Sequence, residues 1–205
     1  MTRRTTIRKQ PEADTLSGRI RNFLSVERVI VGAIILFSLV MVGALVLSSL
    51  ANQPVDIEGL EQIAVGVGGH SESPVNYNQT PPAGGVHYPV WQNCGVYDQP
   101  ILNEMGVHSL EHGAVWITYR PDLSASDVET LSNLVQQSSH RLLSPYPNLP
   151  SPIVASAWGY QVRLERADDP RLGQFIRQYE QGPDTPERGA PCSGAESRAL
   201  PEFPR

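Results

Sequence analysis

Side chains that bind transition metals are concentrated in one stretch of the chain, residues 87–119. This stretch contains three of the five histidines, one of the two cysteines and a His-x-x-Glu-His sequence that runs from His108 to His112. Two histidines four residues apart project from the same face of a helical turn. Imidazole is a good ligand for both copper and zinc, so we expect any chemistry in this protein to occur here.

The histidines of this stretch predict a metal site. His108 and His112, together with His87 or Met105, would supply nitrogen and sulfur ligands. Glu111 would either bind the ion or hold a ligating imidazole in place through a hydrogen bond. A donor set of imidazole and thioether on an oxidising side of a membrane favours copper, with zinc as the second choice.

Two other interpretations of the His-x-x-Glu-His sequence compete with the metal-binding one. The same spacing occurs in inverted zinc peptidases, where the glutamate is the general base. That motif needs a helix of several turns, whereas Gly106 lies just ahead of it and Gly113 and a β-branched segment follow at once. A peptidase is therefore disfavoured, and no catalytic residue is assigned. In the purely structural interpretation, His108 and His112 bond to backbone carbonyls at a tight turn, and Glu111 accepts from one of them.

An apolar segment precedes this region and predicts a membrane anchor. Residues 29–50 contain no charged side chain in 22 positions, which as a helix would extend roughly 33 Å at about 1.5 Å per residue. The apolar core of a signal peptide is shorter, and no clear cleavage site follows this segment. We predict a single uncleaved transmembrane helix, because a buried core helix is rarely apolar on every face.

Charge is distributed unevenly on the two sides of this segment. Residues 1–28 carry a net charge of plus four within a total of minus five, which leaves minus nine for the rest. Basic residues stay on the cytoplasmic side, so we expect residues 1–28 to form a cytoplasmic tail and residues 51–205 to be extracytoplasmic. The acidic outer part contains no lysine. It therefore has no basic surface for binding nucleic acid. Because of the predicted anchor, the expected partners are the bilayer and other subunits of a membrane complex.

The two cysteines suit a disulfide in an oxidising compartment. A bond between Cys94 and Cys192 would stabilise the fold by about 4 to 5 kcal/mol in the chain-entropy model. Cys94 would then be unable to bind a metal as a thiolate. The two remaining histidines, His70 and His140, are expected at the surface and receive no role.

The pattern of apolar residues and turn formers predicts a small α/β sandwich with a loop-rich amino-terminal part. Residues 51–86 are rich in glycine and proline and are predicted to be a linker, residues 87–182 form the domain, and residues 183–205 form a tail pinned by the disulfide. The expected elements are a strand at 114–119, a helix from Ser124 to about Leu143, strands at 153–157 and 160–164, and a helix from Asp169 to Gly182.

Three runs in this sequence resemble a known bacterial family. They are His87-Tyr88-Pro89-Val90-Trp91, Cys94-Gly95-Val96-Tyr97 and the segment from His108 to Trp116. They are similar to the signature of the family catalogued as domain of unknown function thirty-one-oh-five, over roughly residues 60–195. The resemblance implies one amino-terminal membrane helix followed by an outer domain, and it implies no activity.

Two functions follow from these observations. In the first, a single-pass, membrane-anchored extracytoplasmic domain binds a transition metal, copper in preference to zinc. In the second, the protein is an accessory or interaction subunit of a larger membrane complex, without metal and without catalysis. The histidines and the disulfide would then only hold the shape of the domain.

Overall fold

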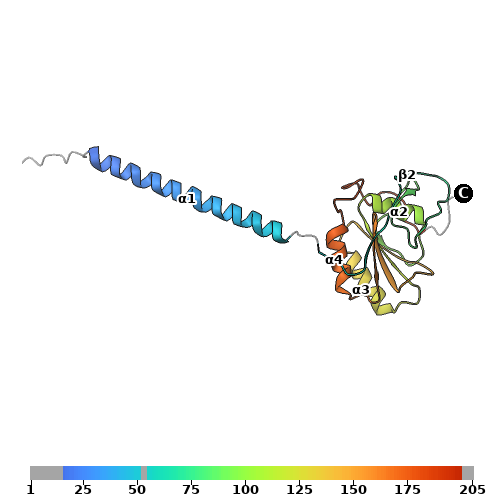
Figure 1. Cartoon of the computed structure of the whole chain (residues 1–205). Coiled ribbons are helices and arrows are strands. Elements are labelled where there is room, and N and C mark those ends of the chain that lie inside the picture. The colour runs from blue at the N-terminus through green and yellow to red at the C-terminus, as the bar shows by residue number, and fades with distance from the viewer. Residues whose placement is uncertain (1–15, 52–54, 200–205) are drawn as a thin grey trace, which may run out of the picture. The chain divides into compact units, whose positions relative to one another are not determined.

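The computed structural model describes residues 16–51 and 55–199, and Figure 1 shows the whole chain. The chain divides between residues 53 and 54 into an amino-terminal unit and a larger domain. The amino-terminal unit is one helix, α1 (Leu16–Ala51). The first 15 residues of the predicted cytoplasmic tail, and residues 200–205 of the predicted carboxyl-terminal tail, lie outside the described residues.

Helix α1 contains a span long and apolar enough to cross a membrane. This span is Val26–Ser49, with 24 residues; it contains an 18-residue window with a mean hydropathy of 2.9, and its side chains are exposed. Apolar side chains on every face of a helix have no favourable contact with water, whereas lipid tails accept them. The length and composition of α1 therefore suit a membrane-spanning segment.

A six-stranded mixed sheet forms the centre of the domain, in the order β1-β8-β7-β5-β6-β4. The pairs β5–β6 and β4–β6 are parallel, and the pairs β1–β8, β7–β8 and β5–β7 are antiparallel. The strands are β1 (Leu60–Gln62), β4 (Gly95–Val96), β5 (Val115–Tyr119), β6 (Arg141–Pro145), β7 (Ile153–Ala157) and β8 (Tyr160–Leu164).

Helices cover both faces of this sheet, which confirms the predicted α/β sandwich. Successive residues of a strand point to opposite faces, and β5 shows this clearly. Val115 and Ile117 belong to a core shared with α3 and α4, whereas Trp116 packs with Leu110 of α2. Figure 1 shows α3 and α4 close together, with α2 and the short strand β2 on the other side of the domain. The helices are α2 (Asn103–Glu111), α3 (Ala125–Val135) and α4 (Pro170–Tyr179).

Helix α3 begins where the sequence predicted and ends earlier. The Ser124 hydroxyl accepts a hydrogen bond from the Asp127 backbone N–H at 3.1 Å, which satisfies one of the free donors at the helix start. The prediction that the helix continues to Leu143 was wrong, because residues 141–145 form β6. Leu142 and Leu143 are both fully buried, one in each of the two cores on opposite faces of the sheet. Adjacent residues buried on opposite sides fit a strand and do not fit one stripe of a helix.

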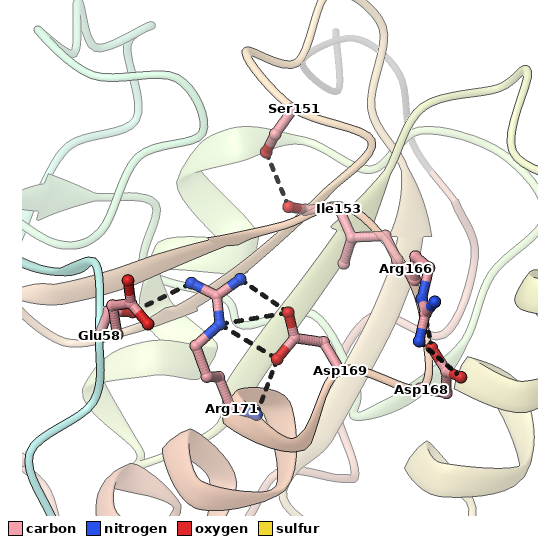
Figure 2. A network of polar contacts seen from close by, with 7 residues as sticks. All are labelled: Glu58, Ser151, Ile153, Arg166, Asp168, Asp169 and Arg171. Atoms are coloured by element: carbon pink, nitrogen blue, oxygen red, sulfur yellow. Dashed lines mark hydrogen bonds and ion pairs between the residues drawn. The ribbon is translucent and has the colours of Figure 1, made fainter.

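The predicted start of α4 is confirmed, and it ties the domain together (Figure 2). The Asp169 carboxylate accepts from the Arg171 backbone N–H at 2.9 Å, and Pro170 occupies the first turn. The Arg171 guanidinium binds the same carboxylate and donates to the Glu58 carbonyl oxygen at 3.0 Å. Its hydrogen bonds and charge lower the pKa of Asp169.

The Glu58 contact shows that residues 55–86, most of the predicted linker 51–86, are part of the domain. Ile57 is buried in the core, and β1 pairs with β8, with Leu60 opposite Val162. Further along the same segment, β2 (Gly69–His70) forms a separate two-stranded parallel sheet with β3 (Val86–His87). The compact domain therefore begins well before residue 87.

The predicted disulfide joins Cys94 to Cys192, with 5.3 Å between their Cα atoms. It holds a segment that we call the carboxyl-terminal strap, residues 183–199. Two backbone hydrogen bonds add to this link: the Cys94 N–H donates to the Cys192 carbonyl at 2.7 Å, and the Asn93 N–H donates to the Glu196 carbonyl at 2.8 Å. The strap is thus fixed against the residues that precede α2.

Gly106 permits the close approach of α2 to β5. A Cβ atom at this position would lie 2.8 Å from Cζ3 of Trp116, whose indole is fully buried. We expect Gly106→Ala to lower the free energy of unfolding by about 1 to 2 kcal/mol, because overpacking costs about 1 to 3 kcal/mol and the better helix propensity of alanine recovers up to about 1 kcal/mol.

Urea titration followed by tryptophan fluorescence measures this change, with Gly173→Ala in α4 as the matched control. A Cβ atom at Gly173 would meet only the end of the Arg177 side chain, at 3.3 Å. The control should therefore gain about 0.5 to 1 kcal/mol. Equal gains for both alanines would contradict the close contact between Gly106 and Trp116.

Candidate metal centre

Helix α2 carries the His-x-x-Glu-His sequence in its last turn. His108 and Glu111 lie within the helix, and the backbone N–H of His112 caps it by donating to the His108 carbonyl at 3.2 Å. Gly113 then takes a φ of +93°, and the chain turns directly into β5. The helix is short, with nine residues, and ends directly after the motif as the sequence indicated, although Gly106 lies inside it.

The small sheet β2–β3 places two more histidines beside this turn. Its parallel register sets His70 opposite His87, and their ring centroids are 4.9 Å apart. The ring of His108 lies 4.7 Å from that of His87 and 5.1 Å from that of His70. Three imidazoles from three different elements therefore face a common space.

Four side chains converge closely enough to hold one ion. One donor atom from each of His70, His87, His108 and Glu111 can be chosen so that all lie within 4.8 Å of one another. Ligands about 2.0 to 2.1 Å from a tetrahedral zinc ion are roughly 3.4 Å apart, so a modest contraction would give ideal bonds. His87, His108 and Glu111 are buried, and only His70 is exposed.

Backbone carbonyls fix the orientation of the buried imidazoles. His87 Nδ1 lies 2.8 Å from the Gly85 carbonyl oxygen, and His108 Nδ1 lies 2.7 Å from the Tyr88 carbonyl oxygen. A carbonyl can only accept, so in each ring Nδ1 carries the proton. In the neutral ring this leaves the lone pair on Nε2, and metal-binding histidines are commonly oriented in this way.

The Nε2 atom of His87 is the clearest sign of a missing partner. The side chain is fully buried and this atom has no hydrogen-bond partner, although Glu111 Oε2 lies only 3.0 Å away. The Gly85 carbonyl holds a proton on Nδ1, so in the neutral ring Nε2 directs a lone pair towards the carboxylate. Two lone pairs facing each other in a buried site are unfavourable. Either a second proton on the ring, which would give an ion pair, or a metal ion between the two atoms would relieve this contact.

The protonation state of His108 suits it to bind a cation. The pKa of its imidazole is lowered to about 4, mainly because burial disfavours the charged ring. The hydrogen bond to the Tyr88 carbonyl raises this pKa, and the charges of the neighbouring histidines lower it slightly further. The ring is therefore neutral at pH 7. Its Nε2 lone pair is available to a metal without first losing a proton.

The structure places the other predicted ligands around this group of four. His112 donates from Nδ1 to the Pro191 carbonyl at 2.8 Å, and its Nε2 lies 3.4 Å from a carboxylate oxygen of Glu187 in the strap. Its ring stands edge-on to that of His108, with centroids 4.7 Å apart, but His112 is not a member of the group. Met105 is buried in α2, and the sulfur of Cys94 is used by the disulfide.

His70 is the member that sequence reasoning missed. It was expected to be a surface histidine, and it is exposed, but its pairing with His87 brings it into the site. The only local signal is a pair of glycines just before each histidine: Gly68-Gly69 directly precedes His70, and Gly84-Gly85 precedes His87 with Val86 between them. The register of two-residue strands has no periodic pattern by which it could be recognised from sequence.

Comparison with known protein families gives one match, to the family described as Protein of unknown function (DUF3105), over residues 70–194. The matched region begins at His70 and extends past Cys192, so it contains the four converging side chains and both cysteines. Searches among curated proteins and among solved structures gave no match. Because the match covers more than half of the chain, the protein belongs to the DUF3105 family.

Proposed function

We propose that this protein binds a divalent transition metal ion through His70, His87, His108 and Glu111. The observation that carries the proposal is the buried Nε2 atom of His87, which has no hydrogen-bond partner and faces a carboxylate. A bound ion would accept both lone pairs and remove this unfavourable contact. The carbonyl-bound Nδ1 atoms of His87 and His108 support it further, because they direct the opposite ring nitrogens into the group.

Copper is the proposed ion and zinc the second choice. Three imidazoles and one carboxylate suit Cu²⁺ and Zn²⁺, and a nitrogen and oxygen site of this kind binds copper more tightly by the Irving–Williams order. The earlier preference for copper rested on a thioether ligand. The group of four contains no sulfur. A thioether would favour copper here only if Met105 also bound the ion.

We further propose that α1 anchors the protein and that the domain lies outside the cytoplasm. Residues 29–50 of α1 carry no charge and are long enough for a bilayer, and the basic residues before them favour a cytoplasmic amino terminus. The disulfide supports the same placement, since such bonds persist in oxidising compartments. The metal site would then face the outside of the cell or an equivalent compartment.

Metal analysis of the full-length protein in detergent tests this function. The protein is stripped with a chelator, dialysed against zinc or copper, freed of excess ion and analysed for metal. We expect about one ion per chain, and copper should displace zinc in competition. A content below about 0.1 ion per chain after reconstitution would refute metal binding, and would favour an accessory subunit in which these histidines only hold the fold.

A further inference from the structure

We infer that His70 is the replaceable ligand of this site, and that the ion enters and leaves by exchanging His70 for an incoming nitrogen or sulfur donor. This inference rests on the proposed metal binding and concerns how the same site is loaded and emptied. In the exchange, a bond forms between the ion and the incoming donor, and the bond to the His70 imidazole breaks. No electron is transferred, and the displaced imidazole remains on the protein.

Burial separates His70 from the other three ligands. His87 is 0% exposed, His108 4% and Glu111 8%, whereas His70 is exposed. Aromatic rings line the buried side, with Trp158 at 6.0 Å from His87 and Trp91 at 5.7 Å from His108, measured between ring centroids. A donor from solution or from another protein therefore meets the ion most directly on the His70 side.

Hydrogen bonding also separates His70 from the two buried histidines. The two buried imidazoles are each fixed by a carbonyl, from Gly85 and Tyr88. In the part of the chain that the structure describes, no hydrogen bond holds the ring of His70. Its strand β2 has only two residues, and the preceding Gly69 has a φ of +151° with open space where a side chain would be. His70 can therefore turn away from the group without breaking a hydrogen bond of its own ring.

The chemical class of the incoming group follows from the ion and the site. Zn²⁺ and Cu²⁺ bind imidazole and thiolate, so a histidine or cysteine of a second metal-binding protein, or a small molecule with such a donor, has the required chemistry. Imidazole is the simplest probe of this class. If the site is open at His70, imidazole should occupy the position that the side chain leaves.

The experiment compares His70→Gly with His108→Gly in the full-length protein in detergent, loaded with zinc. We expect His70→Gly to weaken binding and to speed ion release to a chromophoric chelator by at least about tenfold, and millimolar imidazole to restore most of the loss. His108→Gly should bind far more weakly, and imidazole should not rescue it, because that position is buried. Thermal unfolding of both metal-free variants shows whether each still folds.

A second measurement uses the unaltered protein, so its result does not depend on whether the variants fold. Release of zinc from the wild type should accelerate in proportion to the concentration of added imidazole, as expected for exchange assisted by an incoming donor. A release rate that does not respond to imidazole, or an imidazole rescue of His108→Gly equal to that of His70→Gly, would overturn the role of His70. Such results would leave metal binding itself standing, whereas a wild type that binds no zinc or copper would end both proposals.

Discussion

Replacing His108 with asparagine is expected to raise the dissociation constant for the metal by more than about 100-fold. Loss of a group that merely orients a ligand already costs about 10- to 100-fold, and the loss of a donor should exceed this. The asparagine amide can still donate to the Tyr88 carbonyl in place of Nδ1, so the local backbone keeps its partner. Competition with a chelator of known affinity, in the full-length protein, measures the change.

The same replacement at His112 is the matched control. Its Nδ1 is bonded to the Pro191 carbonyl in the same way, but it lies outside the group of four. We expect His112→Asn to change the affinity by less than about tenfold. This pair of variants decides between the ligands predicted from sequence and those brought together by the fold. A loss at His112 as large as that at His108 would show that the sequence-based set was the better one.

The regular elements were predictable because their signals are local. The β-branched and aromatic run of β5, the Ser124 cap of α3 and the Asp169-Pro170 start of α4 each determine a backbone conformation within a few residues. The end of α3 was not predictable in the same way. Leu142 continued an apolar spacing that began in the helix, and only the pairing of β6 with β5 and β4 shows that this spacing ends at Val135.

Within the candidate site, sequence reasoning identified the residues close together in the chain. His108 and Glu111 were found because they share one turn of α2, and His87 because it lies in the same donor-rich stretch. His70 was missed because its place depends on the β2–β3 register across 16 intervening residues of glycine- and proline-rich chain. For the same reason, the strap could not be placed against α2 before the structure showed its contacts.

Removing the disulfide with the double variant Cys94→Ser and Cys192→Ser should lower the free energy of unfolding by about 4 kcal/mol. The two residues are 98 positions apart, and a cross-link that closes so long a loop removes much of the entropy of the unfolded chain. All three tryptophans lie in the domain, so their fluorescence reports its unfolding in urea. Wild-type protein treated with a thiol reductant is the control and should lose the same amount.

The disulfide should also matter to the metal centre, because the strap contacts the end of α2. The Glu187 backbone N–H donates to the Glu111 carbonyl at 3.0 Å, and the Pro191 carbonyl accepts from His112. Releasing the strap removes the partners that hold the turn after Glu111. We therefore expect the double variant to bind the ion roughly 10-fold more weakly in the absence of urea, measured on protein whose tryptophan fluorescence shows that it is folded. If its affinity is unchanged while its stability falls, the strap stabilises the domain without helping to position Glu111.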